Sequence, residues 1–315
     1  MTQAKPIIGV SACVIGHKVR FDSGHKRSAF VDDQLRQLVE FKPLCPEVNV
    51  GMTTPRPTIR LREVAGSIRL MDDKNHIDHT DAMNRYSDEV LPTLSELSGY
   101  VVCAKSPTCG MERVKILQED CKGAQYKGRG VFTSALMRRY PLLPVEEDGR
   151  LNDLPIRENF VLRVLIYHQA KALLQKPSQR ALLHFHQKHK LLLLAHNEPI
   201  YRQLGPLVAT EFEGSDSDKA LQYVTQMMAA LAKPATRRGH TNVLQHIQGY
   251  FKKDLEPSEK QHLQDTILAY HSGQLPLMAP MTVVKHILSK YPKPYISDQS
   301  YLEPTPVQLA LRCNL

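Results

Sequence analysis

The order of the apolar segments constrains the fold of this chain more than any other feature. In the first half, short apolar runs of strand length alternate with segments of helical periodicity, an order typical of a parallel sheet with crossover helices. The second half shows helical patterns only. A length of 315 residues favours two domains. The sequence therefore predicts an α/β domain with a parallel sheet over residues 1–152 and an all-helical domain over residues 153–315.

The individual elements of the first half follow from these patterns. Strands are predicted at Pro6–Ala12, Phe41–Leu44 and the segment YVVCA that begins at Tyr100. A hairpin is predicted over Ile59–Met71, turning at Ala65-Gly66. The predicted helices are Asp32–Glu40, Asp78–Leu97 and Phe132–Tyr140.

In the second half, helical periodicity recurs between prolines. Pro177, Pro257 and Pro280 lie near helix starts, where proline is tolerated, and Ser178 and Ser258 are candidate caps. The C-terminal stretch contains four prolines and predicts an extended segment. The predicted helices are Glu158–Leu174, Gln179–Asn197, Lys219–Leu231, Thr241–Phe251, Ser258–Tyr270 and Met281–Tyr291.

The charge balance favours a polyanionic partner. The chain has 41 Lys and Arg against 32 Asp and Glu, a net charge of +9. Residues 1–150 carry 22 basic and 19 acidic groups and residues 151–315 carry 19 and 13, so most of the excess lies in the helical half. Trp is absent and aromatic residues make up 6%, which argues against an extended aromatic platform for single-stranded nucleic acid.

No segment indicates secretion or a membrane span. The N-terminus has only a short apolar stretch, interrupted by Gly9 and Ser11, where a signal peptide has a longer one. The longest later apolar run, Leu191–Ala195, is far below the roughly 20 residues a span requires. We expect a cytoplasmic protein without a membrane partner, and the sequence indicates no oligomeric state.

Three of the six cysteines follow predicted strands or the loops after them. Cys13 follows the first strand, Cys45 the second, and Cys109 lies in the turn after YVVCA. The carboxyl ends of parallel strands meet at one edge of a sheet, where ligands bind in doubly wound folds. Glycines and prolines around these cysteines allow the backbone to approach a ligand closely. The three thiols are therefore expected to converge.

The other cysteines have weaker claims. Cys103 lies inside an apolar strand and is expected to be a small buried side chain, and nothing singles out Cys121 or Cys313. The chain contains no Cys-x-x-Cys pair and no zinc spacing, so the pattern alone leaves metal binding and plain packing both open.

Three segments of the first half, in this order, resemble the signature of the thiouracil desulfidase (TudS-type) family: VSACVIGHKVRFDSGHK, CPEVNVGMTTPRPTIRL and KSPTCG. The second half, with FHQKHKLLLLAH, resembles the helical domain fused to it in the tRNA 4-thiouridine desulfidase (RudS-type) branch. The match spans nearly the whole chain. It departs from the usual pattern at Arg-Phe-Asp-Ser-Gly, where Arg-Tyr-Asp-Gly is expected, and at Ser-Pro-Thr-Cys-Gly, where Ser-Pro-Ser-Cys-Gly is usual.

The resemblance implies a Rossmann-like domain that binds a [4Fe-4S] cluster through three cysteines, here Cys13, Cys45 and Cys109. Three thiolates leave one iron without a protein ligand, and that iron is a suitable partner for a substrate's sulfur. The resemblance also implies an acidic residue and a serine near the cluster, matched by Glu47 and Ser106. Glu47 is the candidate base for water, and Ser106 is a candidate donor or proton relay. Alternatively, Glu47 pairs with an arginine and Ser106 caps a turn.

The predicted function is conversion of 4-thiouridine in tRNA to uridine, without redox change and with release of hydrosulfide. Alternatives are desulfuration of free thiouracil or thionucleosides, and a non-catalytic RNA-binding or redox-sensing metal protein. Candidate RNA contacts are Lys18, Arg20, Arg56 and Lys105, with further basic residues at Lys26, Arg27, Arg60 and Arg62.

Four histidines of the helical half, His184, His186, His189 and His196, suggest a metal site. They lack an accompanying Glu-x-x-His motif, and helix packing or contact with RNA explains them equally well.

Overall fold

The computed structural model describes residues 4–118, 123–210 and 214–305. The chain forms two compact units, Met1–Asp153 and Leu154–Leu315, called here the N-terminal unit and the helical unit. The first holds a parallel sheet with helices and the second is all-helical, so the predicted fold class is confirmed. Within the described residues, no helix is long and apolar enough to cross a membrane.

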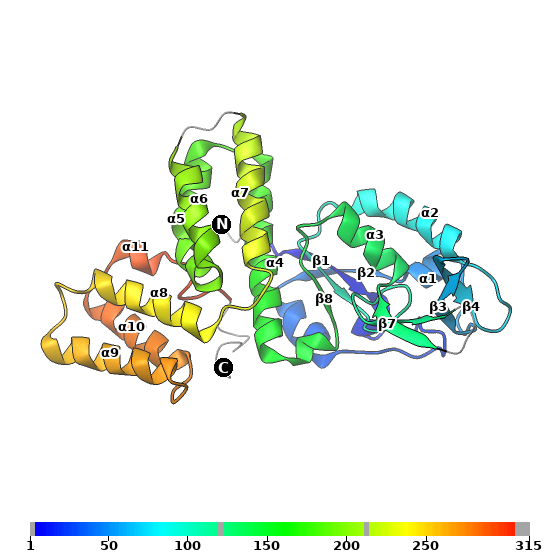
Figure 1. The fold of residues 1–315 in the computed structure, drawn as a ribbon, viewed down its shortest axis with the longest axis horizontal. Coiled ribbons are helices and arrows are strands. Elements are labelled where there is room, and N and C mark those ends of the chain that lie inside the picture. Colours follow the sequence, from blue (N-terminus) through cyan, green and yellow to red (C-terminus); the bar gives the residue numbers. More distant parts are fainter. Residues whose placement is uncertain (1–3, 119–122, 211–213, 306–315) are drawn as a thin grey trace. The chain divides into compact units, whose positions relative to one another are not determined.

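The N-terminal unit is built on two four-stranded sheets (Figure 1). Sheet A is entirely parallel, in the order β2-β1-β5-β8. Sheet B has the order β4-β3-β6-β7, with hairpins β3–β4 and β6–β7 joined by a parallel β3–β6 pair. The strands are β1 (Ile7–Ser11), β2 (Glu40–Leu44), β3 (Ile59–Val64), β4 (Ser67–Asp72), β5 (Gly99–Val102), β6 (Val114–Leu117), β7 (Ala124–Gly128) and β8 (Val145–Glu147).

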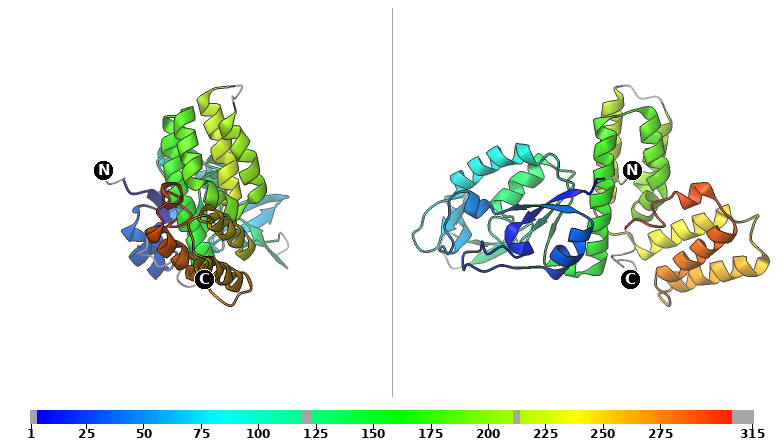
Figure 2. Two further views of the ribbon diagram at one scale, coloured as in Figure 1. Left: turned by 90° about the vertical axis from the view of Figure 1, so that its left-hand side faces the viewer. Right: turned by 180° about the vertical axis from the view of Figure 1, so that it is seen from behind.

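Helices of the N-terminal unit cover the sheets on more than one side. Helices α2 and α3 pack against each other (Figure 1), and the view from behind brings β1 and the turn after it to the front (Figure 2). Burial of β1 and β5 is nearly complete, which places sheet A in the core. The helical segments are η1 (Ala12–Ile15), η2 (Phe30–Gln34), η3 (Leu35–Gln37), α1 (Pro46–Asn49), α2 (Thr80–Val90), η4 (Leu91–Leu94), α3 (Val131–Arg139) and η5 (Arg150–Asn152).

In the helical unit, α4 to α7 pack on one another, and α5 also packs on α8, which in turn lies against α9 and α10. Figure 1 shows both groups of helices. Their cores are aliphatic, with Tyr223, Phe160 and Phe251 among the fully buried rings. The helices are α4 (Leu154–Gln175), α5 (Gln179–His196), α6 (Glu198–Ala209), α7 (Asp216–Ala230), α8 (Arg237–Tyr250), α9 (Pro257–His271), α10 (Met278–Lys290) and α11 (Pro294–Ser297).

Several predicted elements need correction. The helix predicted over Asp32–Glu40 is a π-helical turn and a 3-10 turn, because Glu40 already pairs with Ile7 in sheet A. The α-helix predicted to Leu97 gives way at Leu91 to a 3-10 turn that contains Pro92, which has no N–H to continue the helical hydrogen bonds. The hairpin over β3 and β4 is confirmed, with both turn residues at positive φ.

Further corrections concern the second half. Helix α6 was not predicted, since its internal Gly205-Pro206 is typical of a break. Ser178 caps α5 as predicted, whereas Glu256, and not Ser258, precedes α9. The predicted extended C-terminal segment instead contains α11, a short helix with a proline in its first turn. Pro306 lies outside the described residues.

Candidate active site at the carboxyl edge of sheet A

The candidate site lies where the central strands of sheet A end. Strand β1 runs parallel to both β2 and β5, so the loops after all three strands emerge at one edge. Cys13 lies in η1 after β1, Cys45 directly follows β2, and Cys109 belongs to the turn after β5. These loops border a cavity of about 350 Å³.

Four thiols line this cavity. The structure brings Cys13, Cys45 and Cys109 together and adds Cys103 to them. Cys45 is half-buried and the other three are buried. Cys103 is thus a buried side chain, as its apolar strand predicts, but it also lies at the site. Cys121 and Cys313 lie outside the described residues.

The thiols differ in acidity. A hydrogen bond to Cys103, together with burial, raises the pKa of Cys13, and the same hydrogen bond lowers the pKa of Cys103. Burial raises the pKa of both Cys45 and Cys109. Desolvation therefore disfavours thiolates at the three proposed ligand positions, and a bound cation is the charge that would favour them.

The donors at this cavity are those that an iron–sulfur cluster prefers. The four thiols line one cavity, and thiolate sulfur is the ligand that holds iron in such clusters. Hence the residues present fit a cluster.

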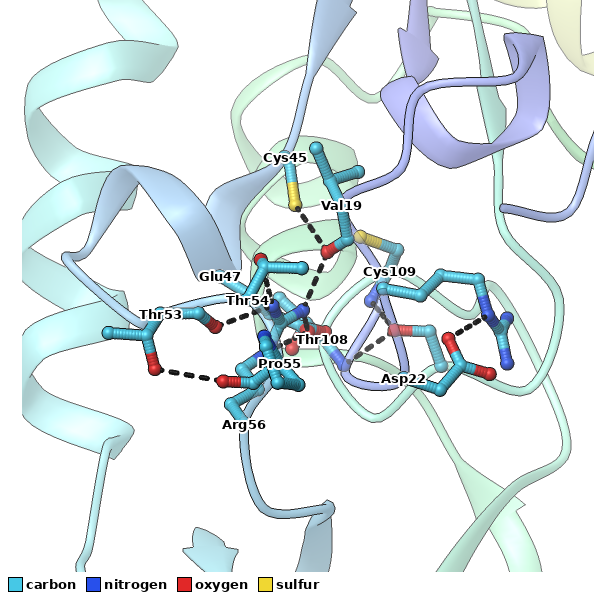
Figure 3. A network of polar contacts seen from close by, with 12 residues as sticks. Val19, Asp22, Cys45, Glu47, Thr53, Thr54, Pro55, Arg56, Thr108 and Cys109 are labelled. Atoms are coloured by element: carbon cyan, nitrogen blue, oxygen red, sulfur yellow. Dashed lines mark hydrogen bonds and ion pairs between the residues drawn. The ribbon is translucent and has the colours of Figure 1, made fainter. Parts of the chain in front are cut away.

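Short contacts fix the loop that carries Cys45 (Figure 3). Cys45 precedes α1, and its carbonyl accepts a hydrogen bond from the backbone N–H of Asn49. Its Sγ lies 3.9 Å from the carbonyl oxygen of Val19, which also accepts from Arg56 Nη2 at 3.0 Å. One carbonyl therefore links the Cys45 loop to the segment that follows η1.

Glu47 stands at the cavity wall in an ion pair with Arg56. Arg56 Nε donates to Glu47 Oε2 at 3.1 Å, and the two side chains are 4% (Arg56) and 15% (Glu47) exposed. Arg56 Nη1 also donates to the carbonyl of Thr53 and the hydroxyl of Thr54. The predicted RNA contact of Arg56 therefore needs correction: its guanidinium is buried and engaged, and it orients Glu47.

Ser106 shapes the turn that carries Cys109. Its Oγ accepts hydrogen bonds from the backbone N–H of Thr108 at 3.2 Å and of Cys109 at 3.1 Å. Thr133 Oγ1 donates to the carbonyl of Cys109 at 2.6 Å and ties the turn to α3. Ser106 therefore has the capping role that the sequence left open, and its hydroxyl hydrogen remains to be donated within the cavity that it lines.

Sequence reasoning missed two polar residues of the site. Asp148 directly follows β8, is 5% exposed and pairs with Lys26 Nζ at 3.0 Å. It also accepts from the backbone N–H of Ala104 at 2.7 Å, next to Cys103. Ser11, the last residue of β1, accepts from the N–H of Cys103 at 3.1 Å. Their position at strand ends was the available signal, but β8 was not predicted as a separate strand.

The remaining basic candidates differ in their position relative to the cavity. Arg20, Lys26 and Lys105 line it, and Lys18 does not; Lys18 and Lys105 are both exposed. Arg20 Nε lies 3.5 Å from Asp22 Oδ1. Three more pair with carboxylates: Arg27 with Asp32 and Asp33, and Arg60 and Arg62 with Asp73.

Three of the four histidines of α5 are hydrogen-bonded within the helical unit, and His184 is exposed. His186 Nδ1 lies 3.0 Å from Tyr223 Oη, His189 Nδ1 lies 2.8 Å from Ser300 Oγ, and His196 Nδ1 lies 2.8 Å from the carbonyl oxygen of Lys233. Burial lowers the pKa of His186 to about 4 and that of His189 to about 3. The burial of His186 and His189 and their contacts with Tyr223 and Ser300 make packing the interpretation that the structure favours.

Two family models match separate parts of the chain. Residues 8–148 match the family model described as 2-thiouracil desulfurase, and residues 190–306 match a family of unknown function, DUF1722. The uncharacterized protein YbgA of Escherichia coli K12 is 38% identical over 157 residues, 49% of this chain and 93% of that protein. A solved structure of TudS, a [4Fe-4S]-dependent thiouracil desulfidase, is 27% identical with a TM-score of 0.39, covering 49% of this chain and 97% of that one. Every residue that lines the cavity lies within residues 8–148.

Proposed function

Because the chain belongs to the TudS-type 2-thiouracil desulfurase family, we propose that it removes sulfur from 4-thiouridine in tRNA. The reaction replaces the C=S bond of the base by C=O. Water supplies the oxygen, sulfur leaves as hydrosulfide, and no external electrons are needed. The observation that carries the proposal is the convergence of Cys13, Cys45 and Cys109 on one cavity inside the matched region.

The proposed cofactor is a [4Fe-4S] cluster held by these three cysteines, with one iron free of protein ligands. The soft thiol donors and the volume that they surround support this choice. When bound, the cluster supplies a thiophilic Lewis acid that polarises the thiocarbonyl. Cys103 lines the same cavity and is left without a ligand role in this proposal.

Two side chains of the cavity have proposed chemical roles. Glu47, whose carboxylate is held by Arg56, accepts the proton of the attacking water. Ser106, whose oxygen already accepts two backbone N–H groups, donates its hydroxyl hydrogen to the pyrimidine ring or relays a proton to it. Both side chains line the cavity that would receive the base.

The proposed partner is tRNA. We assign phosphate contacts near the target base to Lys105 and Arg20, which line the cavity, and to the exposed Lys18 on the loop after η1. The excess positive charge of residues 151–315 supports a role of the helical unit in holding the rest of the RNA. A modified base in folded tRNA is stacked, so the enzyme must also expose it.

The test uses anaerobically purified full-length protein whose iron and acid-labile sulfide have been measured. It is incubated with tRNA that contains 4-thiouridine, and the nucleosides are analysed by mass spectrometry. We expect loss of 4-thiouridine with an equal gain of uridine and hydrosulfide. Intact 4-thiouridine beside a filled cluster would overturn the proposal.

The ligand assignment has its own test. Single replacement of Cys13, Cys45 or Cys109 by Ala is expected to abolish the cluster, as judged by iron and sulfide content and by the visible absorption spectrum. Cys103→Ala serves as the matched control, since it removes a thiol from the same cavity. A cluster that survives Cys109→Ala but not Cys103→Ala contradicts the assignment.

A further inference from the structure

The aspartate that follows β8 connects three loops at the carboxyl edge of sheet A. Asp148 is 5% exposed, and its backbone N–H donates to the carbonyl of Val102 at 3.0 Å. Its Oδ1 accepts from the backbone N–H of Ala104 at 2.7 Å and from Lys26 Nζ at 3.2 Å. Its Oδ2 lies 3.0 Å from the same Nζ. One carboxylate therefore joins the end of β8, the loop after β5 and the segment that follows η1.

Lys26 is held at both of its ends. Its backbone N–H donates to the carbonyl of Cys13 at 2.9 Å, and its ammonium is held by Asp148. Lys26 lines the cavity of the four cysteines, whereas Asp148 is not among the described residues that line it. The lysine side chain is 40% exposed and the aspartate side chain 6%, so a ligand can reach the lysine but not the carboxylate. The ion pair therefore presents its positive end to the cavity.

Two ion pairs at the cavity thus offer groups of opposite charge. In the pair of Glu47 and Arg56, the carboxylate is the more accessible member, at 15% exposure against 4%. In the pair of Lys26 and Asp148, the ammonium is the more accessible one. Replacement of sulfur by oxygen has two electrostatic needs, a base for the proton of water and a positive charge near the sulfur that departs. The proposed reaction assigns the first to Glu47 and leaves the second without a side chain.

We propose that the ammonium of Lys26 contacts the substrate sulfur as the C–S bond breaks and stabilises the negative charge that the sulfur acquires. The electrons of the broken bond stay on sulfur, and water supplies the oxygen of the new C=O bond. One proton of water goes to Glu47 and the other to sulfur, which leaves as hydrosulfide, while Lys26 keeps its own protons. Asp148 is the positioning residue that fixes the ammonium. This role of Lys26 rests on the proposed function, because that reaction releases anionic sulfur.

The test measures the affinity of the protein for the anionic product alone. Sodium hydrosulfide is titrated anaerobically into the cluster-loaded full-length protein, and binding is followed by the visible absorption spectrum. Lys26→Met is expected to weaken binding by about tenfold or more, because it removes the charge, and Lys26→Arg is expected to retain most of the affinity. Lys42→Met is the matched control and is expected to bind like wild type. Lys42 is 37% exposed and pairs with Glu96 at 2.6 Å in the same unit, but it is outside the described lining of the cavity.

Asp148→Asn separates an electrostatic role from a structural one. The amide oxygen can still accept from Ala104 and Lys26, while the negative charge beside the ammonium is gone. Hydrosulfide is therefore expected to bind at least as tightly as in wild type, and the midpoint potential of the cluster is expected to rise, whereas Lys26→Met lowers it. Loosened loops would instead weaken hydrosulfide binding in both variants, and that result overturns the inference.

The remaining outcomes distinguish this role from the proposed function. Equal hydrosulfide affinity in Lys26→Met and wild type overturns the role of Lys26 and leaves the proposed function intact, even if tRNA binds more weakly, because the lysine would then contact phosphate. If Lys26→Met takes up no cluster, Asp148→Asn decides, since a fall in its hydrosulfide affinity overturns the role. A wild-type protein that takes up no cluster overturns both.

Discussion

At the scale of single residues, the structure makes Glu47 the most informative side chain for the mechanism. A carboxylate that is 15% exposed and paired with a nearly buried guanidinium is held in one place. Such a pair is compatible with a general base and equally with a purely structural ion pair, because both roles need a fixed carboxylate. The two roles predict different activities for a variant that has a neutral side chain of the same shape.

Glu47→Gln separates them. The amide oxygen still accepts from Arg56, so the fold and the cluster are expected to persist, but the residue can no longer take a proton. If Glu47 is the base, kcat falls by about 10²–10⁴-fold with little change in KM. The matched control is Glu146→Gln, since Glu146 is a buried carboxylate of the same unit that pairs with Arg150 at 2.7 Å. Equal activity of Glu47→Gln and Glu146→Gln contradicts a chemical role for Glu47.

The candidate site also shows how far single residues could be predicted. Three cysteines could be assigned to the carboxyl edge of sheet A, because each follows a strand or lies in the turn after one. The carboxyl ends of parallel strands meet at one edge whatever the side chains are. Asp148 could not be predicted, because it follows a three-residue strand, β8, that carries little periodicity.

At the scale of elements, the contact between α5 and α8 depends on one glycine. A Cβ on Gly239, in the first turn of α8, would overlap the carbonyl oxygen of Ala195, near the end of α5. That oxygen belongs to backbone and cannot turn away, so Gly239→Ala forces the helices apart. Gly249 lies near the other end of α8, where a Cβ meets no described atom within 4 Å.

These two glycines predict opposite effects of the same substitution. Gly239→Ala is expected to destabilise the protein by about 1–3 kcal/mol through steric overlap. Gly249→Ala is expected to stabilise it by up to about 0.5–1 kcal/mol, because alanine loses less backbone entropy in a helix. Urea unfolding of the two variants measures both free energies. A shift of the same sign in both variants contradicts the packing argument.

The buried histidines of α5 predict a pH dependence of stability. The pKa is lowered to about 4 in His186 and about 3 in His189, mainly by burial, while the unfolded chain takes up protons near pH 6.5. As pH falls below 6.5, the unfolded state binds more protons than the folded state. The free energy of unfolding that depends on these neutral histidines is therefore fully present above pH 6.5 and is lost toward pH 4. The slope is about 1.4 kcal/mol per pH unit for each histidine.

Hydrogen-exchange protection factors of α5 between pH 7 and pH 5 measure this loss. His189→Gln is expected to reduce the slope, and His184→Gln, which changes an exposed histidine of the same helix, is expected to leave it unchanged. A wild-type slope in His189→Gln would show that other groups cause the loss.

The elements themselves were predictable to different degrees. Long periodic helices such as α5 and the tight β3–β4 hairpin follow from local patterns. Helix α6 could not be predicted in this way, because its internal Pro206 is unfavourable in a helix. Strands β6 and β7 are short and carry little apolar periodicity. They exist because β6 pairs with β3, a contact between distant parts of the chain that no local window contains.

At the scale of the whole molecule, the distribution of charge leads to different expectations for an RNA substrate and for a free base. The helical half carries 19 basic against 13 acidic groups but none of the residues that line the cysteine cavity. A free thiopyrimidine needs only the cavity. An RNA substrate would in addition gain binding free energy from phosphate contacts spread over basic surfaces outside it.

Salt concentration tests this difference with one protein and two substrates. Binding of RNA through several phosphates releases counterions, so kcat/KM for tRNA is expected to fall steeply, by about 10-fold or more, between 50 and 200 mM salt. Turnover of free 4-thiouridine has no such contacts and is expected to change little. Rates for both substrates, measured with the same cluster-loaded preparation, give the two slopes. Because the cluster and the cavity are common to both reactions, a parallel fall of the two rates would show that salt acts on the cluster or the fold. Equal activity on both substrates without a salt dependence would favour a free thiopyrimidine as the substrate.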